Sequence, residues 1–341
     1  MGENMSSKKG FLFFKKKISV GGFSSVVGER EGKGPLKDSF DEILKGHMFS
    51  EKTFERAESK MQKIAAIKAM QSANLTGDEI DAIFAGDLLN QCIGTSYGLK
   101  NLNIPLVGLY GACSTIGEAI LVAASFIEAG FFKKTISISS SHFCAAERQF
   151  RFPLEYGSHR TKTSQWTVTG AGAVLLQEGE KEKIFVRAGC IGKIVDFGID
   201  DSNNMGAAMA PSAADTILRF FRATKTSHLD YDLILTGDLG EIGMIAFLEI
   251  LKREGFDLEQ KYKDCGLLIY DREKDKEINS GGSGAGCCAS VLCSYVLKKL
   301  KKKEIKKLIF IATGALMSKT SSQQKETIPA ISHLVFLEGE N

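Results

Sequence analysis

The chain is poor in several features that mark particular classes of protein. Its 341 residues include only five prolines and one tryptophan, and its eight cysteines contain no Cys-x-x-Cys pair. A structural zinc site and a disulfide framework are therefore both unexpected. Cysteines in apolar or Gly-rich surroundings are typical of reduced thiols. We expect the protein to hold no metal and to need no cofactor.

Charge of one sign and long apolar runs are also scarce. The formal net charge is +3, and no basic stretch interleaved with aromatic residues is present, so nucleic acid is not an expected partner. The apolar run at residues 11–14 is too short for a signal-peptide core. No stretch reaches the roughly 18 apolar residues of a membrane span. We therefore expect no transmembrane segment, and a chain that stays on the cytoplasmic side where it is made.

One run of charge stands apart, "KKLKKKEIKK" at residues 298–307. Lysines after a helix are favoured by the negative end of the helix dipole, which makes a solvated helix end the simpler interpretation. Contact with anionic lipid headgroups is the alternative, and the sequence leaves both open.

Two modules recur in the second half of the chain in the same order. "DAIFAGDL", starting at Asp81, matches "DLILTGDL", starting at Asp232, and both are apolar strands that end in Gly-Asp-Leu. "GACSTIGEAILVAASFIEAGFFKKTISISSS" matches "GAGCCASVLCSYVLKKLKKKEIKKLIFIATG", and each reads as a turn, an apolar helix, a Lys-Lys pair and a strand. The repeat predicts a duplicated α/β unit.

The repeat also predicts the layout of the fold. The two apolar helices, expected at residues 114–129 and 287–300, carry little charge and should be buried between two mixed sheets. The polar, Gly-rich connection near residues 198–212 suggests halves at 1–198 and 199–341.

Cys113 lies in the turn before the first of these helices. A cysteine at a helix N-terminus meets unpaired backbone amides and the positive end of the dipole, which favour its thiolate and make the turn an anion receptor. The matching position in the second half is Gly286, so the turn does not require cysteine. A small packed residue is the simpler alternative to a reactive or binding one.

A duplicated α/β unit with such a cysteine resembles the thiolase fold, a layered αβαβα architecture shared by thiolases and ketoacyl synthases. Three long strings resemble the stage V sporulation protein AD family of spore-forming bacteria more specifically, from about residue 11 to residue 338. They are "GFSSVVGEREGKGPLKDSFD", "SSSHFCAAERQFRFPLEYGSHRTKTSQWTVTGAGAVLL" and "ATGALMSKTSSQQKETIPAISHLV".

The resemblance implies a function. Members of that family are expected to bind dipicolinic acid (pyridine-2,6-dicarboxylate) and to help move it into the forespore with membrane proteins of the same operon. The chain would then be peripheral to the forespore or inner spore membrane, with calcium entering only as a counter-ion of the ligand. The thiolase fold further implies a homodimer, which we expect to form through strands near residues 135–145.

The catalytic relatives place histidine, or histidine and asparagine, on two strand ends of the second half. Here those positions read "TGDLG" around Asp238 and "SGGSG" around Ser283. The five histidines, at 47, 142, 159, 228 and 333, fall elsewhere. Because an enolate beside Asp238 would be repelled, we expect a binding protein and not an enzyme. Cys287 and Cys288 follow the second turn and are expected to serve packing.

A planar dianion needs hydrogen-bond donors, a guanidinium and an apolar slot for its ring. Each candidate also has a structural alternative, namely capping for the serines, core packing for His142 and ion pairs with Glu147 or Glu155 for the arginines. Arg151 and Arg160 follow Arg148 in the same loop and share this alternative. The predicted ligand contacts are Cys113, Ser139, Ser140, His142, Arg148, Ser283 and Gly284.

Two other functions stay open on the sequence. Cys113 could be the nucleophile of an acyltransferase related to ketoacyl synthases, or the chain could be a purely structural subunit of a membrane complex. The enzyme would need histidines on the two strand ends, and the structural subunit would need no cavity at Cys113.

Overall fold

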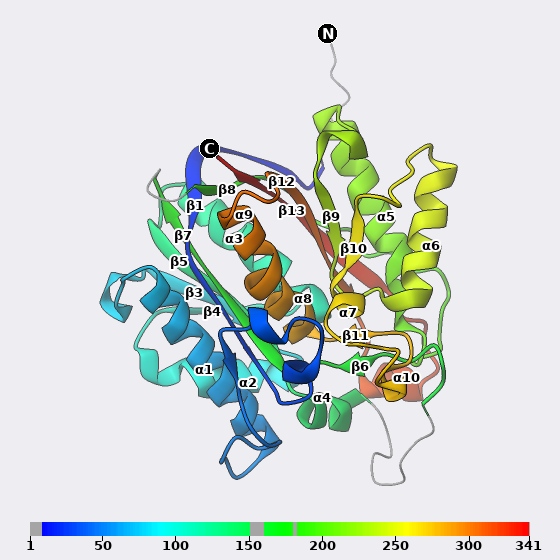
Figure 1. The fold of residues 1–341 in the computed structure, drawn as a ribbon, viewed down its shortest axis with the longest axis horizontal. Coiled ribbons are helices and arrows are strands. Elements are labelled where there is room, and N and C mark those ends of the chain that lie inside the picture. The colour runs from blue at the N-terminus through cyan, green and yellow to red at the C-terminus, as the bar shows by residue number, and fades with distance from the viewer. Residues whose placement is uncertain (1–8, 151–159, 180–182, 341) are drawn as a thin grey trace.

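Each half of the chain builds the same set of main strands, and helices connect them (Figure 1). The computed structural model describes residues 9–150, 160–179 and 183–340, so Arg151, Glu155 and His159 lie outside it. The first half contains β1 (Phe11–Val27), β2 (Glu42–Ile43), α1 (Phe54–Ser72), β3 (Ala82–Gly86), α2 (Ile93–Leu99), β4 (Leu106–Gly108), α3 (Thr115–Glu128), β5 (Lys134–Ser141), α4 (Phe143–Phe150), β6 (Trp166–Thr167) and β7 (Gly170–Glu178).

The second half repeats this plan with two long outer helices. It contains β8 (Ile184–Cys190), α5 (Met205–Thr224), β9 (Leu233–Thr236), α6 (Gly240–Arg253), β10 (Tyr262–Asp264), α7 (Cys265–Leu268), β11 (Gly282–Ser283), α8 (Ala285–Val291), α9 (Leu297–Lys301), β12 (Lys307–Ala315), α10 (Lys319–Gln323) and β13 (Ala330–Gly339). Among the described residues, no helix is long and apolar enough to cross a membrane.

The strand order confirms the duplication. The first half runs β4-β3-β5-β7-β1 and the second runs β10-β9-β12-β13-β8, so each half places its third, second, fourth, fifth and first main strand in that order. In this order β8 is the first strand of the second half. The second repeat therefore begins before the expected boundary between residues 198 and 199.

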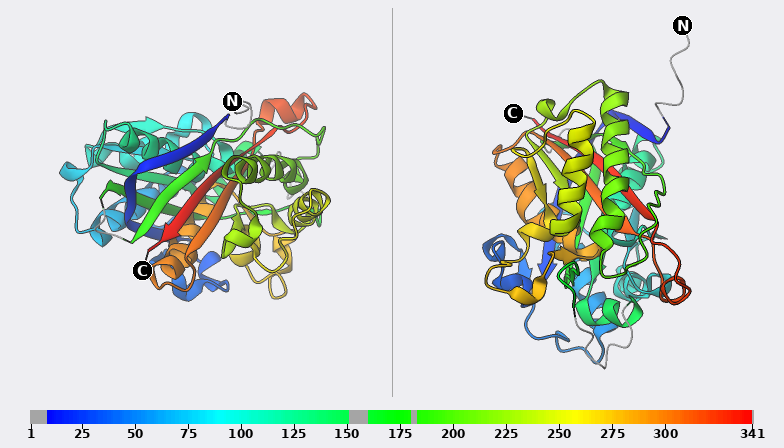
Figure 2. Two further views of the ribbon diagram at one scale, coloured as in Figure 1. Left: turned by 90° about the horizontal axis from the view of Figure 1, so that it is seen from above. Right: turned by 90° about the vertical axis from the view of Figure 1, so that its right-hand side faces the viewer.

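The half-sheets are not separate, and in this respect the expectation of two sheets is wrong. β1 and β8 pair antiparallel, which joins both halves into one 11-stranded sheet. In the left view of Figure 2 the blue β1, the green β8 and the red β13 run side by side. The first strand of each half lies at its inner edge, and pairing the two strands satisfies backbone groups that would otherwise be unpaired.

Alternating side chains divide the sheet into an inner and an outer face. Phe84 on β3 and Phe310 on β12 belong to one apolar cluster with the central helices, whereas the neighbouring Ile83 packs under α1 and Ile309 under α5 and α6. Successive strand residues point to opposite faces. The result is the predicted five-layer αβαβα arrangement, with helices outside and between the two halves of the sheet.

The two predicted central helices are present and buried. α3 covers residues 115–128 of the expected 114–129, preceded by a short 3-10 turn at Ala112–Ser114. The second runs from α8 through a π-helical segment (Leu292–Val296) into α9, covering 285–301 instead of 287–300. Cys287 and Cys288 are fully buried at its start, as the packing interpretation expects.

One pair of equivalent aspartates shows the repeat at atomic detail. Asp81 Oδ2 accepts hydrogen bonds from the backbone amides of Lys133 and Lys134, at 2.7 and 2.8 Å. Asp232 Oδ2 accepts them from Lys306 and Lys307, at 2.7 and 2.9 Å. Each aspartate therefore fixes the start of a central strand to the strand beside it.

The strand order leaves no place for sheet pairing through β5 in the dimer contact expected near residues 135–145. β5 lies between β3 and β7 and pairs with both along its length. A strand with a neighbour on each side has no free edge for a second chain.

Replacing either aspartate by alanine should lower the free energy of unfolding by about 1 to 2 kcal/mol, because two amides lose a charged acceptor. If the halves are equivalent, Asp81→Ala and Asp232→Ala should shift the urea midpoint by nearly equal amounts. Asp200→Ala, an exposed aspartate in a connecting segment, is the control and should cause no shift. A large shift in one aspartate variant alone would contradict the equivalence.

Candidate functional site

Cys113 lies in a tight turn between β4 and α3. Ala112 has a positive φ of 51°, a conformation that costs a non-glycine residue about 1 kcal/mol or more and that clusters at functional sites. Thr115 holds the turn closed, because its Oγ1 accepts from the amide of Gly111 at 3.1 Å and donates to the carbonyl of Ala112 at 2.7 Å. The thiol is thereby positioned at the start of a buried helix.

The equivalent position in the second half could not carry a cysteine. A Cβ atom added to Gly286 would lie 2.1 Å from the carbonyl oxygen of Gly170. α8 packs directly on β7, and glycine permits that approach. The repeat thus differs at this position because the packing differs.

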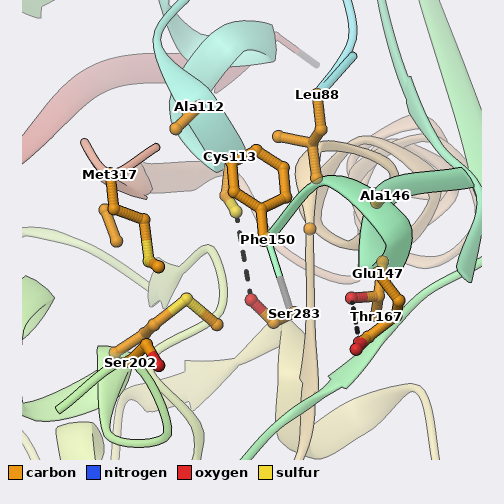
Figure 3. Close-up of a pocket in the computed structure, with 13 residues that line it drawn as sticks. Leu88, Ala112, Cys113, Ala146, Glu147, Phe150, Thr167, Ser202, Ser283 and Met317 are labelled. Atoms are coloured by element: carbon orange, nitrogen blue, oxygen red, sulfur yellow. Dashed lines mark hydrogen bonds between the residues drawn. The ribbon is translucent and has the colours of Figure 1, made fainter. Parts of the chain in front are cut away.

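A cavity of about 50 Å³ opens beside the Cys113 thiol (Figure 3). Its walls come from both halves: the ends of β3 and β12, the Cys113 turn, α4, β6, the start of α5 and the turn before α8. The lining is mainly apolar, with four polar side chains and the Cys113 thiol among Leu88, Ala112, Cys113, Ala146, Glu147, Phe150, Thr167, Ser202, Met205, Ser283, Gly284, Ala315 and Met317.

Asp238 lies behind Ser283, fully buried at the end of β9. Its Oδ1 accepts from Thr313 Oγ1 at 2.7 Å. Its Oδ2 accepts from Ser283 Oγ at 2.7 Å and from the Gly284 amide at 2.9 Å. Burial raises the pKa of this carboxyl, and the three donors oppose that rise.

The thiol of Cys113 continues this network. Its Sγ lies 3.9 Å from Ser283 Oγ (Figure 3). Because Ser283 gives its proton to Asp238, the contact is satisfied when the thiol donates. Burial raises the pKa of the Cys113 thiol well above its usual value, and the Asp238 carboxylate raises it further. The expectation that the helix N-terminus favours a thiolate is therefore wrong for this environment.

Glu147 supplies a second buried carboxylate at the cavity. It is 2% exposed and accepts from Thr167 Oγ1 at 2.9 Å. Arg160 lies 3.2 Å from its Oε2 and stacks over the Trp166 ring, with the guanidinium carbon 4.6 Å from the ring centroid. Pairing of an arginine with Glu147 was the structural alternative for this region, and the structure contains it.

Three of the predicted contact residues meet at the cavity, namely Cys113, Ser283 and Gly284. The remaining four lie outside its lining and have other partners. Ser139 Oγ donates to Ala285 O at 2.8 Å and Ser140 Oγ to Glu58 Oε1 at 2.9 Å; His142 Nε2 is 2.8 Å from His47 O, and exposed Arg148 pairs with Glu55.

Ser139 still bears on the site, because its bond to Ala285 ties the end of β5 to the start of α8. Ser141 Oγ does the same by accepting from the Gly286 amide at 2.9 Å. These serines position the second half's turn against the first half.

Several lining residues escaped the sequence reasoning. Ser202 and Met205 fall in the stretch that was interpreted as a linker, and Met317 follows a strand end to which no role was given. Thr313, whose hydroxyl donates to Asp238, could have been found from the sequence, because it aligns with Ser140 when the second repeated module is placed on the first.

Histidine is missing from the lining of this cavity as far as the described residues show it. His142 packs against Phe49 and Phe54 on the other side of β5's end. His333 is buried on β13, and burial lowers its pKa to about 4. In this part of the chain Asp238 and Ser283 occupy the two strand-end positions beside the thiol.

The fold and the site define a class of protein, the thiolase-like α/β proteins. 3-Oxoacyl-[acyl-carrier-protein] synthase III of Aquifex aeolicus VF5 superposes with a TM-score of 0.59 at 13% identity, over 94% of this chain and 99% of that one. A Xanthomonas campestris OleA variant superposes with a TM-score of 0.62 at 13% identity, over 96% and 99%. These likenesses establish the fold.

Sequence similarity identifies the family. The model of stage V sporulation protein AD (SpoVAD) matches residues 8–338, and the Bacillus subtilis (strain 168) stage V sporulation protein AD is 42% identical over 325 residues, 95% of each chain. The chain belongs to the SpoVAD family. A β-ketoacyl-[acyl-carrier-protein] synthase III of Psychromonas ingrahamii is 31% identical over 130 residues, 36% of this chain and 38% of that protein. The family's name is that of a sporulation protein and states no reaction.

The raised pKa of Cys113 predicts slow alkylation at neutral pH. Its rate of reaction with iodoacetamide should keep rising about tenfold per pH unit up to pH 9, because the thiolate fraction does so below the pKa. Asp238→Asn should speed the reaction, since it removes the negative charge that raises the pKa. Peptide mass spectrometry gives the rate, with urea-unfolded protein as the control. A plateau between pH 6 and 8 would contradict the prediction.

Proposed function

We propose that the protein binds dipicolinic acid without catalysis in the cavity at Cys113, and so supports its uptake into the developing spore together with a membrane channel complex. The observation that carries the proposal is the Cys113–Ser283–Asp238 chain. A buried carboxylate and a hydroxyl that is already donating to it stand where condensing enzymes use proton-donating groups.

This arrangement disfavours acyl chemistry on two grounds. The thiol is protonated, whereas a cysteine nucleophile acts as thiolate. An enolate or oxyanion formed at Cys113 would meet Asp238 instead of a donor, and losing such a donor costs about 3 to 4 kcal/mol. The cavity keeps the geometry of a thiolase-like site but lacks, in its described part, the groups that move protons.

The walls suit a flat ring with polar edges. Leu88, Phe150, Met205 and Met317 provide the apolar slot. The two methionines are unbranched and can shift to enlarge a cavity that is small without a ligand. The Cys113 thiol and the Ser202 hydroxyl can donate to carboxylate oxygens, whereas Ser283 Oγ and the Gly284 amide already donate to Asp238.

Charge is the remaining requirement. The described lining contains Glu147 and no cationic side chain, and Arg160 is already paired with Glu147. A dianion would be repelled there unless a positive charge accompanied it. Calcium entering as the counter-ion of dipicolinate satisfies this condition. No cofactor resident in the protein is proposed.

Cys113→Ala should weaken dipicolinate binding by about 1 to 2 kcal/mol, roughly five- to thirtyfold, because one polarizable donor is lost from a pocket that otherwise persists. Cys113→Leu should abolish binding by filling the cavity. Cys144→Ala, on α4 and outside this cavity, should bind like the wild type. Titration calorimetry, with and without calcium, measures all four proteins.

The two alternative functions predict different results for the wild type and the Cys113 variants. An acyltransferase would form a stoichiometric acyl adduct on Cys113 with acyl-CoA thioesters, visible by intact-mass spectrometry and missing from Cys113→Ala. A purely structural subunit would bind no dipicolinate in any variant. Either result would overturn the proposed function.

We also propose that the protein is a homodimer and that it works at the forespore or inner spore membrane with the membrane proteins of its operon. β4 is the free edge of the first half-sheet, next to β3 alone. Leu106 and Val107 on β4 are each 39% exposed, and Tyr110, two residues after β4, is 45% exposed. An apolar edge strand is a template for pairing with a second copy.

Val107→Glu should convert the dimer to a monomer, because it brings two like charges together across the two-fold axis. Sedimentation equilibrium at micromolar concentration measures the mass. Ile245→Glu, on exposed α6 at 58% exposure, is the control and should stay dimeric. A wild-type mass of one chain would refute the dimer.

A further inference from the structure

The end of the molecule at which β5, β8 and β12 begin is rich in exposed lysine. It lies opposite the Cys113 cavity, which is at the ends of β3, β9 and β12, and it holds the C-terminus in Figure 1. We call this surface the lysine face. Its exposed lysines are Lys133, Lys183, Lys301, Lys302, Lys303, Lys306 and Lys307.

Strand topology, and not the lysine run alone, builds this face. Glu340 N donates to Lys183 O and Gly339 N to Lys306 O, both at 2.8 Å, which places the starts of β8 and β12 on the two sides of the end of β13. Lys133 precedes β5 in the other half. Residues more than 170 positions apart in the chain thus contribute to one surface.

The carboxylates nearby are already engaged with other groups. Asp81 and Asp232 accept backbone amides, as described above. The others pair with cations outside the lysine face: Glu79 with Lys134, Glu178 with Lys16, Asp41 with Lys298, Glu304 with Lys299, and Glu338 and Glu340 with Arg187. Within the described residues, no direct salt bridge joins a carboxylate to a lysine of the lysine face, although Glu304 and Asp230 interact electrostatically with Lys302 and Lys307.

The helix dipole accounts for only part of this accumulation. Lysines at the end of α9 complement its negative end, but Lys307 begins β12, and Lys183 and Lys306 immediately precede β8 and β12. Holding several like charges together costs free energy unless a partner uses them. The solvated helix end is therefore an incomplete explanation of the run at 298–307.

The face includes a groove and an exposed aromatic side chain. The groove, about 400 Å³, is lined by Lys183, Lys301 and Lys303 of the lysine face and by Lys298, Asp41 and Glu340, which take part in ion pairs. Phe131 follows α3 two residues before Lys133 and is 74% exposed. Basic groups beside a projecting aromatic ring match a lipid headgroup layer, where ammonium groups meet phosphates and the ring enters the acyl boundary.

We propose that the lysine face docks the protein on an anionic phospholipid bilayer. Docked this way, the Cys113 cavity at the opposite end faces away from the lipid and stays open to ligand from solution. The proposal gives a physical basis to the membrane association in the proposed function, but it requires neither dipicolinate nor the other sporulation proteins.

Flotation of the full chain with pure lipid vesicles tests it. Vesicles of phosphatidylcholine with phosphatidylglycerol should bind the protein, and phosphatidylcholine alone should not. Binding should weaken steeply with added salt, because surface charges are screened. Lys302→Glu with Lys306→Glu should weaken binding to anionic vesicles by about twentyfold or more, since each lysine near the surface contributes roughly fivefold.

Two further variants sharpen the test. Lys45→Glu with Lys52→Glu makes the same change in net charge at exposed positions near the start of α1, and it should bind like the wild type. Phe131→Ser should weaken binding without changing charge. Circular dichroism and calorimetry with dipicolinate check that each variant is folded.

The outcomes separate the two proposals. Failure to bind anionic vesicles at low salt, equal binding to neutral vesicles, or equal loss in both double variants would each overturn lipid docking. Dipicolinate binding by the Lys302→Glu, Lys306→Glu protein with loss of vesicle binding would support both. Vesicle binding without dipicolinate binding would leave docking intact and refute the proposed function.

Discussion

The hydrogen bonds of the buried Asp238 carboxylate hold the candidate site together. They connect the end of β9 to Thr313 on β12 and to the turn before α8, so three segments of the second half converge on one side chain. Cys113 from the first half completes the chain through Ser283. A buried carboxylate needs such donors. Because the Ser283 hydroxyl donates its proton to Asp238, Ser283 cannot act as an acid toward a bound ligand.

The same constraint decides what chemistry the cavity can support. A thiolase-like scaffold can bring a cysteine to the start of a central helix in an enzyme and in a binding protein alike. The reactivity of that cysteine depends on the groups that face it. Here the facing groups keep the thiol protonated. Binding of a preformed ligand needs no proton transfer, and it is compatible with a site of this kind.

Particular residues show how far the sequence could be interpreted. The repeat predicted both central helices to within a few residues and the layered fold, because buried apolar helices and strands have a recognisable pattern. Cys113, Ser283 and Gly284 were placed at one site because they lie in the turns before the two equivalent central helices. Ser139, Ser140, His142 and Arg148 were grouped with them by closeness in sequence, but β5 and α4 turn their side chains toward Ala285, Glu58, His47 and Glu55.

The sequence by itself determined the duplicated architecture and the family, because both depend on patterns that run along the chain. The tertiary structure decided everything that depends on which segments meet. It joined the half-sheets through β1 and β8, surrounded the Cys113 thiol with apolar side chains and Asp238, and collected separate lysines on the end opposite the cavity. A residue's pKa and its partners are set by neighbours distant in the chain, and chain order does not encode those distances.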